Sequence, residues 1–323
     1  MGSMIPTGER EEMAKSGRST AGSRKGIAYA LSAYGIWGIT PIYWKLVAWI
    51  PADEMLVYRV LWTALFLQGW ICLTRRGADF RDLLRGGKQL WTSLAAAILL
   101  GFNWLVFIYA VQTERILAAS LGYYINPLVS VLLGLIVLGE RLSRLQGIAV
   151  ASAAAGVLSL LMDAEGLPWI SVALALSFAL YGLLHKLYPQ PPRSGLALEM
   201  GLLAPLAIGY SLWLAARGQI VQLDASFESH LLVAASALVT SLPLLCFHGA
   251  TRHLTLVSVG MFQYIAPTIG LLLAVFIYGE PFERAESLAF GCVWLGLLCF
   301  AADAFWRSTP RREEALSPPD RNR

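Results

Sequence analysis

The strongest constraint on the fold is an internal repeat. The stretch from Gly101 to Glu140 aligns without a gap on the stretch from Ser241 to Glu280, which begins 140 positions further along the chain. The register pairs Tyr124 with Tyr264, Pro127 with Pro267, and Gly139-Glu140 with Gly279-Glu280. A shared excess of leucine would not place proline and a Gly-Glu pair in one register. The pattern therefore indicates an internal duplication.

Composition places both copies in a membrane. Hydrophobic residues make up 57% of the 323 residues, charged residues make up 14%, and the mean hydropathy is +0.59. Soluble proteins carry about 25% charged residues. The apolar runs are about 20 residues long, which is enough to cross about 30 Å of hydrocarbon as helices, and they lack the alternation of barrel strands. The four cysteines lie within these runs at no metal-ligand spacing, so we expect them to be packing residues.

The predicted fold class is an all-α membrane protein with ten transmembrane helices. We expect these helices at 26–50, 55–74, 90–112, 116–139, 145–162, 167–187, 195–216, 230–250, 254–279 and 285–306. Residues 26–163 then form the first five-helix repeat and residues 167–306 the second. Residues 1–25 and 307–323 are expected to be polar tails.

Loop charges predict the orientation in the membrane. Arginine and lysine gather in both tails and in the loops after the second, fourth, sixth and eighth helices, whereas the opposite loops hold only Arg115, Arg217 and Arg284. The positive-inside rule then puts both tails in the cytoplasm. Because five helices are an odd number, the second copy must enter the membrane from the other side. Such an inverted repeat is typical of secondary transporters, which bind substrate near the midplane between the copies.

Several stretches resemble one transporter family. They are AYGIWGITPIYWKL at 33–46, PADE at 51–54, ASLGYYINPL at 119–128, PLLCF at 243–247 and FQYIAPT at 262–268. On these motifs the chain resembles, over about residues 25–306, the RarD subfamily of the EamA-type carriers in the drug/metabolite transporter (DMT) superfamily. The resemblance implies an inner-membrane carrier. It leaves the substrate open, because RarD proteins are usually labelled chloramphenicol-resistance permeases while related exporters move amino acids and other metabolites.

Aromatic and polar side chains at helical spacing form a candidate substrate-binding set. Its members are Tyr34, Trp37, Arg59, Trp62, Asn103, Tyr123, Tyr124, Asn126, Gln263 and Tyr264. Single aromatic residues are more often packing, and Asn126 has helix-to-helix hydrogen bonding as an alternative role. Together with an inverted repeat, the set favours a cavity with aromatic walls and a few polar anchors.

Pro127 and Pro267 are predicted hinges. Each removes a backbone hydrogen bond in mid-helix, and in lipid such a break survives only where protein or a cavity satisfies the freed group. A static packing kink is the alternative reading. The symmetric placement of the two prolines favours hinges that line the substrate path.

Arg59 carries a permanent charge where the membrane makes charge expensive. A substrate carboxylate could neutralise it, and so could Asp53 or Glu54 as a gate or a structural pair. Neutral donors and acceptors lie on neighbouring helices, and no deep acidic residue is there to meet a cation. The set therefore predicts a small carboxylated substrate, such as an amino acid, rather than a large hydrophobic cation.

Few titratable groups lie deep enough for proton coupling. Glu199 and His248 are the candidates, and coupling to protons is predicted to be weak or absent unless it rests on them. His185 lies near a helix end. Glu140 and Glu280 are expected to pair with arginines at the interface.

Other classes of function find less support in the sequence. The chain has no HExxH motif, no P-loop and no apparent cluster of His, Asp and Glu, so we expect no enzyme, no catalytic residue, no metal and no cofactor. The expected partners are a small-molecule substrate and membrane lipid, with no nucleic acid. Small residues in the fifth and tenth helices suit a scaffold or a homodimer face. A drug efflux permease and a non-transporting membrane scaffold or sensor are the alternative functions.

Overall fold

The computed structural model describes residues 7–74, 77–162, 169–220, 226–279 and 284–308, and over these residues the chain is helical with short connections. The helices are α1 (Thr7–Leu46), α2 (Ala52–Leu73), α3 (Gly77–Arg85), α4 (Gly87–Gln112), α5 (Ile116–Ile136), α6 (Arg144–Met162), α7 (Trp169–Leu187), α8 (Pro192–Ala216), α9 (Phe227–His253), α10 (Leu256–Gln263), α11 (Ile265–Phe276) and α12 (Arg284–Ser308).

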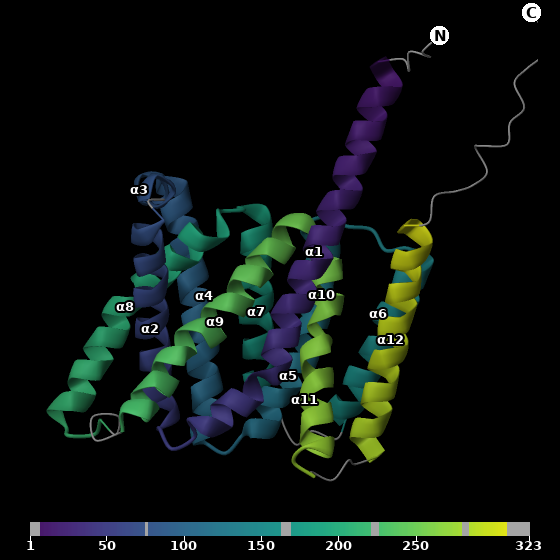
Figure 1. The fold of residues 1–323 in the computed structure, drawn as a ribbon. Coiled ribbons are helices and arrows are strands. Elements are labelled where there is room, and N and C mark those ends of the chain that lie inside the picture. Colours follow the sequence, from purple (N-terminus) through teal and green to yellow (C-terminus); the bar gives the residue numbers. More distant parts are fainter. Residues whose placement is uncertain (1–6, 75–76, 163–168, 221–225, 280–283, 309–323) are drawn as a thin grey trace, which may run out of the picture.

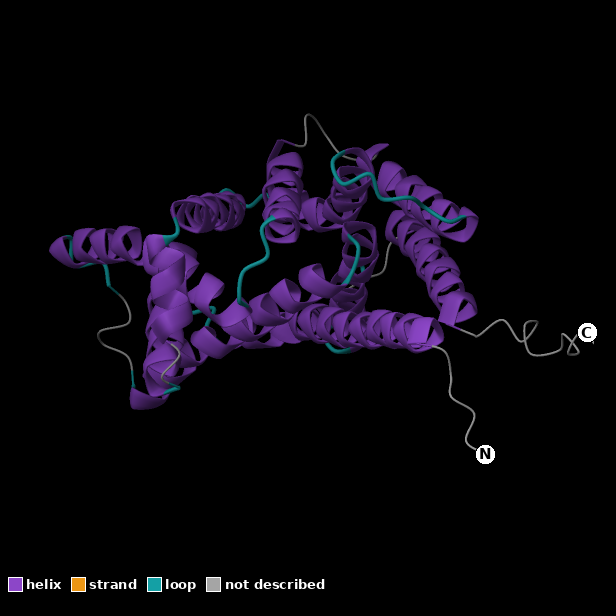
Figure 2. Ribbon diagram, turned by 90° about the horizontal axis from the view of Figure 1, so that it is seen from above, coloured by secondary structure: helices purple, strands orange, loops and turns teal. Residues whose placement is uncertain are grey.

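The helices form one bundle, as the prediction of an all-α membrane protein requires. Nine segments in the described part are long and apolar enough to span a membrane, and α10 and α11 together make one of them. α1 is not in this set, but it packs along α9 and α11, and its Ala30, Ala33 and Tyr34 are buried. With α1 as the tenth, the expected number of spans is present. Figure 1 shows the start of α1 and the end of α12 at the same end of the bundle, with α1 projecting beyond it, and Figure 2 views the bundle from that end.

Three boundaries differ from the expectation. α1 begins at Thr7, so helix extends into the segment expected to be a tail. α3 occupies what was expected to be a loop; it is a short amphipathic helix that buries Leu83 and exposes Arg81 and Arg85. The expected ninth helix is divided at Tyr264 into α10 and α11, three residues before Pro267.

The repeat is visible in the pattern of helix contacts. Helices that correspond under the shift of 140 residues lie against each other: α2 contacts α8, α5 contacts α10, and α6 contacts α12. The contacts of α1 with α9 and α11 are matched by those of α7 with α4 and α5. The repeated glycines Gly139 and Gly279 both have positive φ, 65° and 68°, a region that favours glycine. This explains why the Gly-Glu pair recurs where α5 and α11 end.

The contact between α6 and α12 is reciprocal. A Cβ atom added to Gly156 would lie 2.7 Å from the Ala289 carbonyl oxygen, and one added to Gly296 would lie 2.7 Å from the Ala149 carbonyl oxygen. Ala149 and Ala289 correspond in the repeat, as do Gly156 and Gly296. Gly156 in the first copy therefore packs on Ala289 in the second, and Gly296 in the second copy packs on Ala149 in the first. A two-fold axis between antiparallel helices produces this arrangement, and the missing side chains let the two backbones approach closely.

Adding a methyl group at this contact should destabilise the bundle. Gly156→Ala and Gly296→Ala each push a Cβ against a backbone carbonyl, and overpacking of this kind costs about 1–3 kcal/mol. We expect lower thermal unfolding temperatures of similar size for the two variants in detergent solution. Gly147→Ala is the matched control on α6, because no atom lies within 4 Å of its added Cβ. Two variants as stable as the control would contradict the close contact.

Candidate functional site

An aromatic core lies where the two copies meet near α1 and α7. Trp37 packs edge-on to Phe178 at a ring separation of 5.7 Å. These two residues correspond in the repeat when one extra residue is allowed between the first helices of the two copies. Phe247 contacts both rings and stacks on Tyr181 at 5.8 Å. Tyr34 joins the same core and is 2% exposed. The sequence-predicted Tyr34 and Trp37 are thus part of the packed centre of the bundle.

Three predicted binding residues make contacts between helices. The Asn103 side-chain amide donates to the Leu174 carbonyl and to Ser177 Oγ, both at 2.9 Å, and so joins α4 to α7. The Tyr264 hydroxyl donates to the carbonyl of Tyr124, its counterpart in the repeat, at 3.2 Å. The Asn103 amide nitrogen and the Tyr264 hydroxyl proton are therefore already used within the protein.

Two further predicted residues keep unused acceptors. Gln263 donates to Ser130 Oγ at 3.2 Å, but its Oε1 has no hydrogen-bond partner in the described part of the chain. The same holds for Asn126 Oδ1, and both side chains are buried. A buried amide oxygen without a partner costs about 1–3 kcal/mol, so these atoms are available to a ligand or to water.

Arg59 is the most unusual of the predicted residues. Its guanidinium lies 3.8 Å from the Trp104 ring centroid and 5.5 Å from that of Trp44. Its Nε has no hydrogen-bond partner, and within the described residues it takes part in no ion pair. Tyr43 and Tyr123 are its electrostatic neighbours. The cation is therefore held by aromatic faces from α1 and α4, with its hydrogen-bonding edge uncommitted.

Three hydroxyl groups outside the predicted binding set lie on α2, which carries Arg59, and on α9, which packs against α2. Thr63 on α2, and Ser236 and Thr240 on α9, are buried and lack hydrogen-bond partners among the described residues. α2 packs against α9, and the Tyr43 hydroxyl donates to the Leu232 carbonyl, one helical turn before Ser236, at 2.9 Å. The signal was present as spacing, because Thr63 follows Arg59 by one helical turn and Thr240 follows Ser236 by another.

Trp62 and Tyr123 are the exposed members of the predicted set. Trp62 is 38% exposed and Tyr123 is 50% exposed, and the Tyr123 ring lies 6.4 Å from that of Phe107. Tyr123 is also an electrostatic neighbour of Arg59. Trp62 is one turn from Arg59 on α2, with no ring contact in the described structure.

The two prolines sit in different surroundings. Pro127 lies inside the continuous helix α5, whereas Pro267 follows the break between α10 and α11. Pro267 cannot bond to the carbonyl four residues before it, which is that of Gln263, the last residue of α10. Proline at the equivalent position thus lies within the intact helix α5 in the first copy and just after the break between α10 and α11 in the second.

Four buried side chains from three helices form a second site, here called the four-residue cluster: Tyr181 and His185 on α7, Glu199 on α8 and His248 on α9. The Tyr181 hydroxyl donates to Glu199 Oε2 at 2.9 Å and lies 2.6 Å from His248 Nε2. His185 Nε2 lies 3.2 Å from Glu199 Oε1, and the two imidazole rings are 3.8 Å apart. Each of the four side chains is at most 4% exposed.

This cluster corrects the expectation that His, Asp and Glu would not come together. The ligating atoms of His185, Glu199 and His248 lie within 4.8 Å of one another, which is close enough for an ion. The predicted pair Glu199 and His248 is part of the cluster. His185 is not among the predicted coupling residues, because its position near a helix end does not indicate burial. Tyr181 and His185 are four residues apart and so share one face of α7, which was the available signal.

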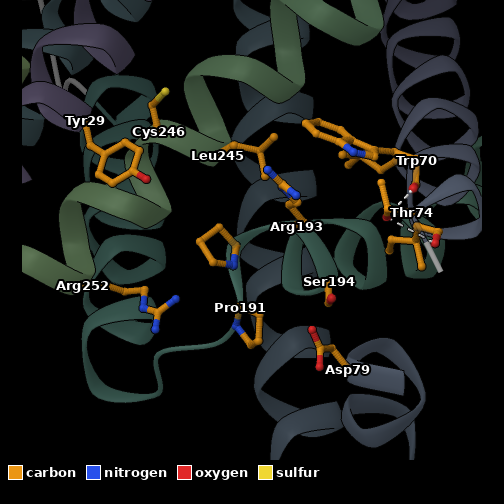
Figure 3. Close-up of a pocket in the computed structure, with 13 residues that line it drawn as sticks. Tyr29, Trp70, Thr74, Asp79, Pro191, Arg193, Ser194, Leu245, Cys246 and Arg252 are labelled. Carbon is orange, nitrogen blue, oxygen red and sulfur yellow. Dashed lines mark hydrogen bonds between the residues drawn. The ribbon is translucent and has the colours of Figure 1, made fainter. Parts of the chain in front are cut away.

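A cavity of about 360 Å³ opens beside the cluster, at the end of the bundle where α1 begins. Its walls come from α1, α2, α3, α8 and α9, and Figure 3 shows Arg193 and Arg252 on either side of Pro191. Pro192 and Cys246 also line it. The His248 ring faces the backbone carbonyl of Pro192, so the cavity reaches within one residue of the cluster.

Polar contacts hold the α9–α10 turn at the same end of the bundle. Glu140 was expected to pair with an arginine, but its carboxylate accepts hydrogen bonds from the backbone N–H groups of Leu256 and Val257 at 2.7 and 2.8 Å. It thereby caps the N-terminus of α10, where free N–H groups favour an anion. Lys186 donates to the Leu254 carbonyl at 2.6 Å. The expectation for Glu280 lies outside the described residues.

Comparison with known proteins identifies the family. Residues 24–162 match the EamA-like transporter family. A protein named RarD from Salmonella typhi is 42% identical over 284 residues, which cover 88% of this chain and 97% of that protein. An uncharacterized transporter, YojE, from Bacillus subtilis is 41% identical, covering 87% of this chain and 94% of its own.

More distant comparisons agree on the fold. A protein from Pseudomonas aeruginosa named chloramphenicol-sensitive protein RarD is 29% identical over 87% of this chain and 95% of its own length. One solved crystal structure superposes with a TM-score of 0.66 over 90% of this chain and 99% of that one, at 15% identity. The protein is therefore a multi-pass membrane transporter that belongs to the RarD subfamily of the EamA-type drug/metabolite transporters.

Proposed function

We propose that this protein is a secondary transporter of small carboxylated metabolites, such as amino acids, with Arg59 as the anchor for the carboxylate. The observation that carries the proposal is the state of Arg59. It is a permanent cation within the bundle, it lies on two tryptophan rings, and it has no carboxylate partner among the described residues. A ligand carboxylate would supply both the missing charge and acceptors for the guanidinium edge.

The contacts of Asp53 weaken the rival explanation, in which Arg59 is locked to a neighbouring carboxylate. Asp53 Oδ2 accepts a hydrogen bond from the Tyr210 hydroxyl at 2.7 Å. Glu54 is buried and interacts with Tyr58 on its own helix. Neither carboxylate forms an ion pair with Arg59 in the described structure.

The surroundings of Arg59 also suit the rest of an amino-acid-like molecule. Trp44 and Trp104 provide flat apolar surface for a side chain. The hydroxyl groups of Thr63, Ser236 and Thr240 lie on α2 and α9, have no hydrogen-bond partner in the described part of the chain, and could accept hydrogen bonds from an ammonium group. The alternative is a drug permease of the chloramphenicol type; the Pseudomonas aeruginosa relative is named chloramphenicol-sensitive protein RarD. Chloramphenicol carries no carboxylate and would not need Arg59.

The Arg59→Gln variant tests the anchor. Carboxylated ligands that raise the thermal stability of the purified wild-type protein should lose at least about tenfold in affinity, because a hydrogen bond to a charged group contributes about 1.5–3 kcal/mol. The measurement is a thermal-shift titration with each of the common amino acids and with chloramphenicol. Arg193→Gln is the matched control, since Arg193 also lies on a tryptophan ring, that of Trp70, but at the end of the bundle.

Two results would decide against the proposal. Equal binding of carboxylated ligands by Arg59→Gln and wild type would show that Arg59 is not the anchor. Stabilisation by chloramphenicol alone, unchanged in Arg59→Gln, would favour the drug permease. A purified protein that neither binds nor moves any of these compounds would favour the scaffold or sensor.

We also propose that transport proceeds by alternating access. In this mechanism the two inverted copies each take up the conformation that the other had. The support is the asymmetry at equivalent positions: α5 is continuous through Pro127, whereas its counterpart is broken into α10 and α11 before Pro267. If the copies exchanged these conformations, the bundle would open on the opposite side. Glu140 and Lys186 hold the α9–α10 turn at the end where α1 begins, so their contacts would break in that exchange.

Replacing either proline should slow this exchange. Pro267→Ala restores a donor for the Gln263 carbonyl, and one backbone hydrogen bond contributes about 1 kcal/mol net, equivalent to about fivefold in rate. We expect slower counterflow of a bound amino acid in liposomes, with its affinity nearly unchanged, for Pro267→Ala and also for Pro127→Ala. Pro205→Ala is the control, because Pro205 lies inside α8 and has no proline counterpart in the repeat. Wild-type rates in both hinge variants would make the prolines static kinks.

We propose that the protein lies in the cell inner membrane with both tails in the cytoplasm, as the loop charges indicate. A single cysteine at Gln89 should then resist an impermeant thiol reagent in intact cells, and one at Gln219 should react. Both positions are exposed, at opposite ends of the bundle, and the native cysteines would first be replaced. Strong labelling at Gln89 with none at Gln219 would reverse the orientation.

A further inference from the structure

We propose that the four-residue cluster of Tyr181, His185, Glu199 and His248 is a proton-binding site that couples transport to proton movement. This inference rests on the proposed transport function and adds a second site to it. The cluster lies on α7, α8 and α9, away from the ring contacts that hold Arg59. It holds four groups able to exchange protons, each at most 4% exposed.

The hydrogen bonds of the cluster leave one contact incomplete. Tyr181 donates to Glu199 Oε2 and lies 2.6 Å from His248 Nε2, and two hydrogens, one on Tyr181 and one on His248, satisfy these contacts. His185 Nε2 and Glu199 Oε1 lie 3.2 Å apart, yet neither has a hydrogen-bond partner within the described residues. An added proton shared by these two groups would turn their contact into a charge-assisted hydrogen bond.

The net charge of the four-residue cluster also favours one added proton. Without the additional proton, the buried cluster has a net charge of −1 from Glu199. With it, the cluster is neutral as a whole, either as a carboxylate with one imidazolium or as a carboxylic acid with two neutral imidazoles. Burying a neutral group costs much less than burying an uncompensated charge. A second added proton is opposed, because the two imidazole rings are only 3.8 Å apart.

The ring geometry favours a proton over a metal ion. A tetrahedral zinc site places ligand atoms about 3.3 Å apart around one point, and each imidazole must direct its lone pair, which lies in the ring plane, at that point. The rings of His185 and His248 are stacked with an interplanar angle of 31°, so their lone pairs do not converge. His248 Nε2 is also already 2.6 Å from the Tyr181 hydroxyl.

The adjoining cavity gives protons a route to the cluster. It is lined by Pro192, whose carbonyl faces His248, and by Ser194 and Cys246 from the same two helices, α8 and α9. Charged groups on neighbouring turns set the potential there. Arg193, Arg252 and Asp79 line the cavity, and Lys186 follows His185 on α7 with its ammonium on the Leu254 carbonyl. The proton therefore enters from the end where α1 begins.

The first experiment measures proton binding on the purified full-length protein without any substrate. Histidine labelled with ¹⁵N should show joint titration of His185 and His248, separate from His253, which is exposed on α9. Glu199→Gln should lower the proton affinity of the joint titration at least about tenfold, since it removes the negative charge. Tyr181→Phe should change the His248 signal while His253 stays unchanged. Histidine signals that are identical in Glu199→Gln and wild type would overturn the proposal.

The second experiment measures coupling in liposomes, with a mixture of radiolabelled amino acids as the probe. A pH difference of one unit can drive at most about tenfold accumulation per coupled proton. We expect accumulation by the wild type and by the control His253→Asn. Glu199→Gln should equilibrate the probe without accumulating it. Accumulation that persists in the Glu199→Gln, His248→Ala double variant, or wild-type protein that equilibrates without accumulating, would overturn the proposal.

The two experiments separate the two proposals. No uptake of any amino acid by wild-type protein, with or without the gradient, would contradict the proposed function. The spectroscopic titration would then still decide whether the cluster binds a proton, because it uses no substrate.

Discussion

Hydrocarbon offers no hydrogen bonds, so each polar group inside this bundle must find a partner in the protein, in a ligand or in trapped water. Most of them do. Asn103 bonds across to α7, Tyr264 bonds to the backbone of α5, and Glu140 caps α10. The groups that lack one within the described residues are then informative. They include Arg59 Nε, the amide oxygens of Asn126 and Gln263, and the pair His185 Nε2 and Glu199 Oε1 in the four-residue cluster. Both proposed sites follow from this single constraint.

The repeat fixes the frame in which these sites lie. Small residues bring α6 and α12 into a reciprocal contact that a two-fold axis explains, and the aligned residues Trp37 and Phe178 meet in the aromatic core. The residues of the two proposed sites and the break between α10 and α11 depart from the symmetry of the repeat. Arg59 corresponds to no arginine in the second copy, and the cluster has no equivalent set of residues in the first. Pro127 and Pro267 correspond, yet one lies in a continuous helix and the other follows a break.

The sequence was enough to predict the fold, because hydrophobic runs and a gap-free repeat are local properties that lipid enforces. It also singled out Arg59, Glu199 and His248, since a charge or a titratable group in an apolar run is conspicuous. It did not distinguish Asn103 and Tyr264, whose side chains bond to neighbouring helices, from predicted residues with unbonded polar atoms. Which side chains meet across two helices depends on how each helix is rotated about its own axis, and the sequence does not show this rotation. His185 was missed for a related reason: its distance from a helix end says little when the neighbouring helices bury that end.

The contact between α2 and α8 connects the two proposed sites. α2 carries Arg59, and nine residues later Gln68 donates to the Ala197 carbonyl of α8 at 3.1 Å, two residues before Glu199. Nine residues of helix span about 13.5 Å along the axis. A charge separation of that order would correspond to an interaction of about 1.2 kcal/mol at an effective dielectric constant of about 20, which is about eightfold in an equilibrium constant.

The sign of this interaction sets the direction of coupling. Under the two proposals, an ionised Glu199 would repel a carboxylate that approaches Arg59. A proton that neutralises the cluster would remove this repulsion, so the proposed substrate would bind more tightly with the proton in place. Because coupling between two binding sites is reciprocal, bound substrate raises the proton affinity of the cluster by the same factor. In a carrier that changes conformation only with both sites filled or both empty, positive coupling of this kind would produce symport rather than exchange.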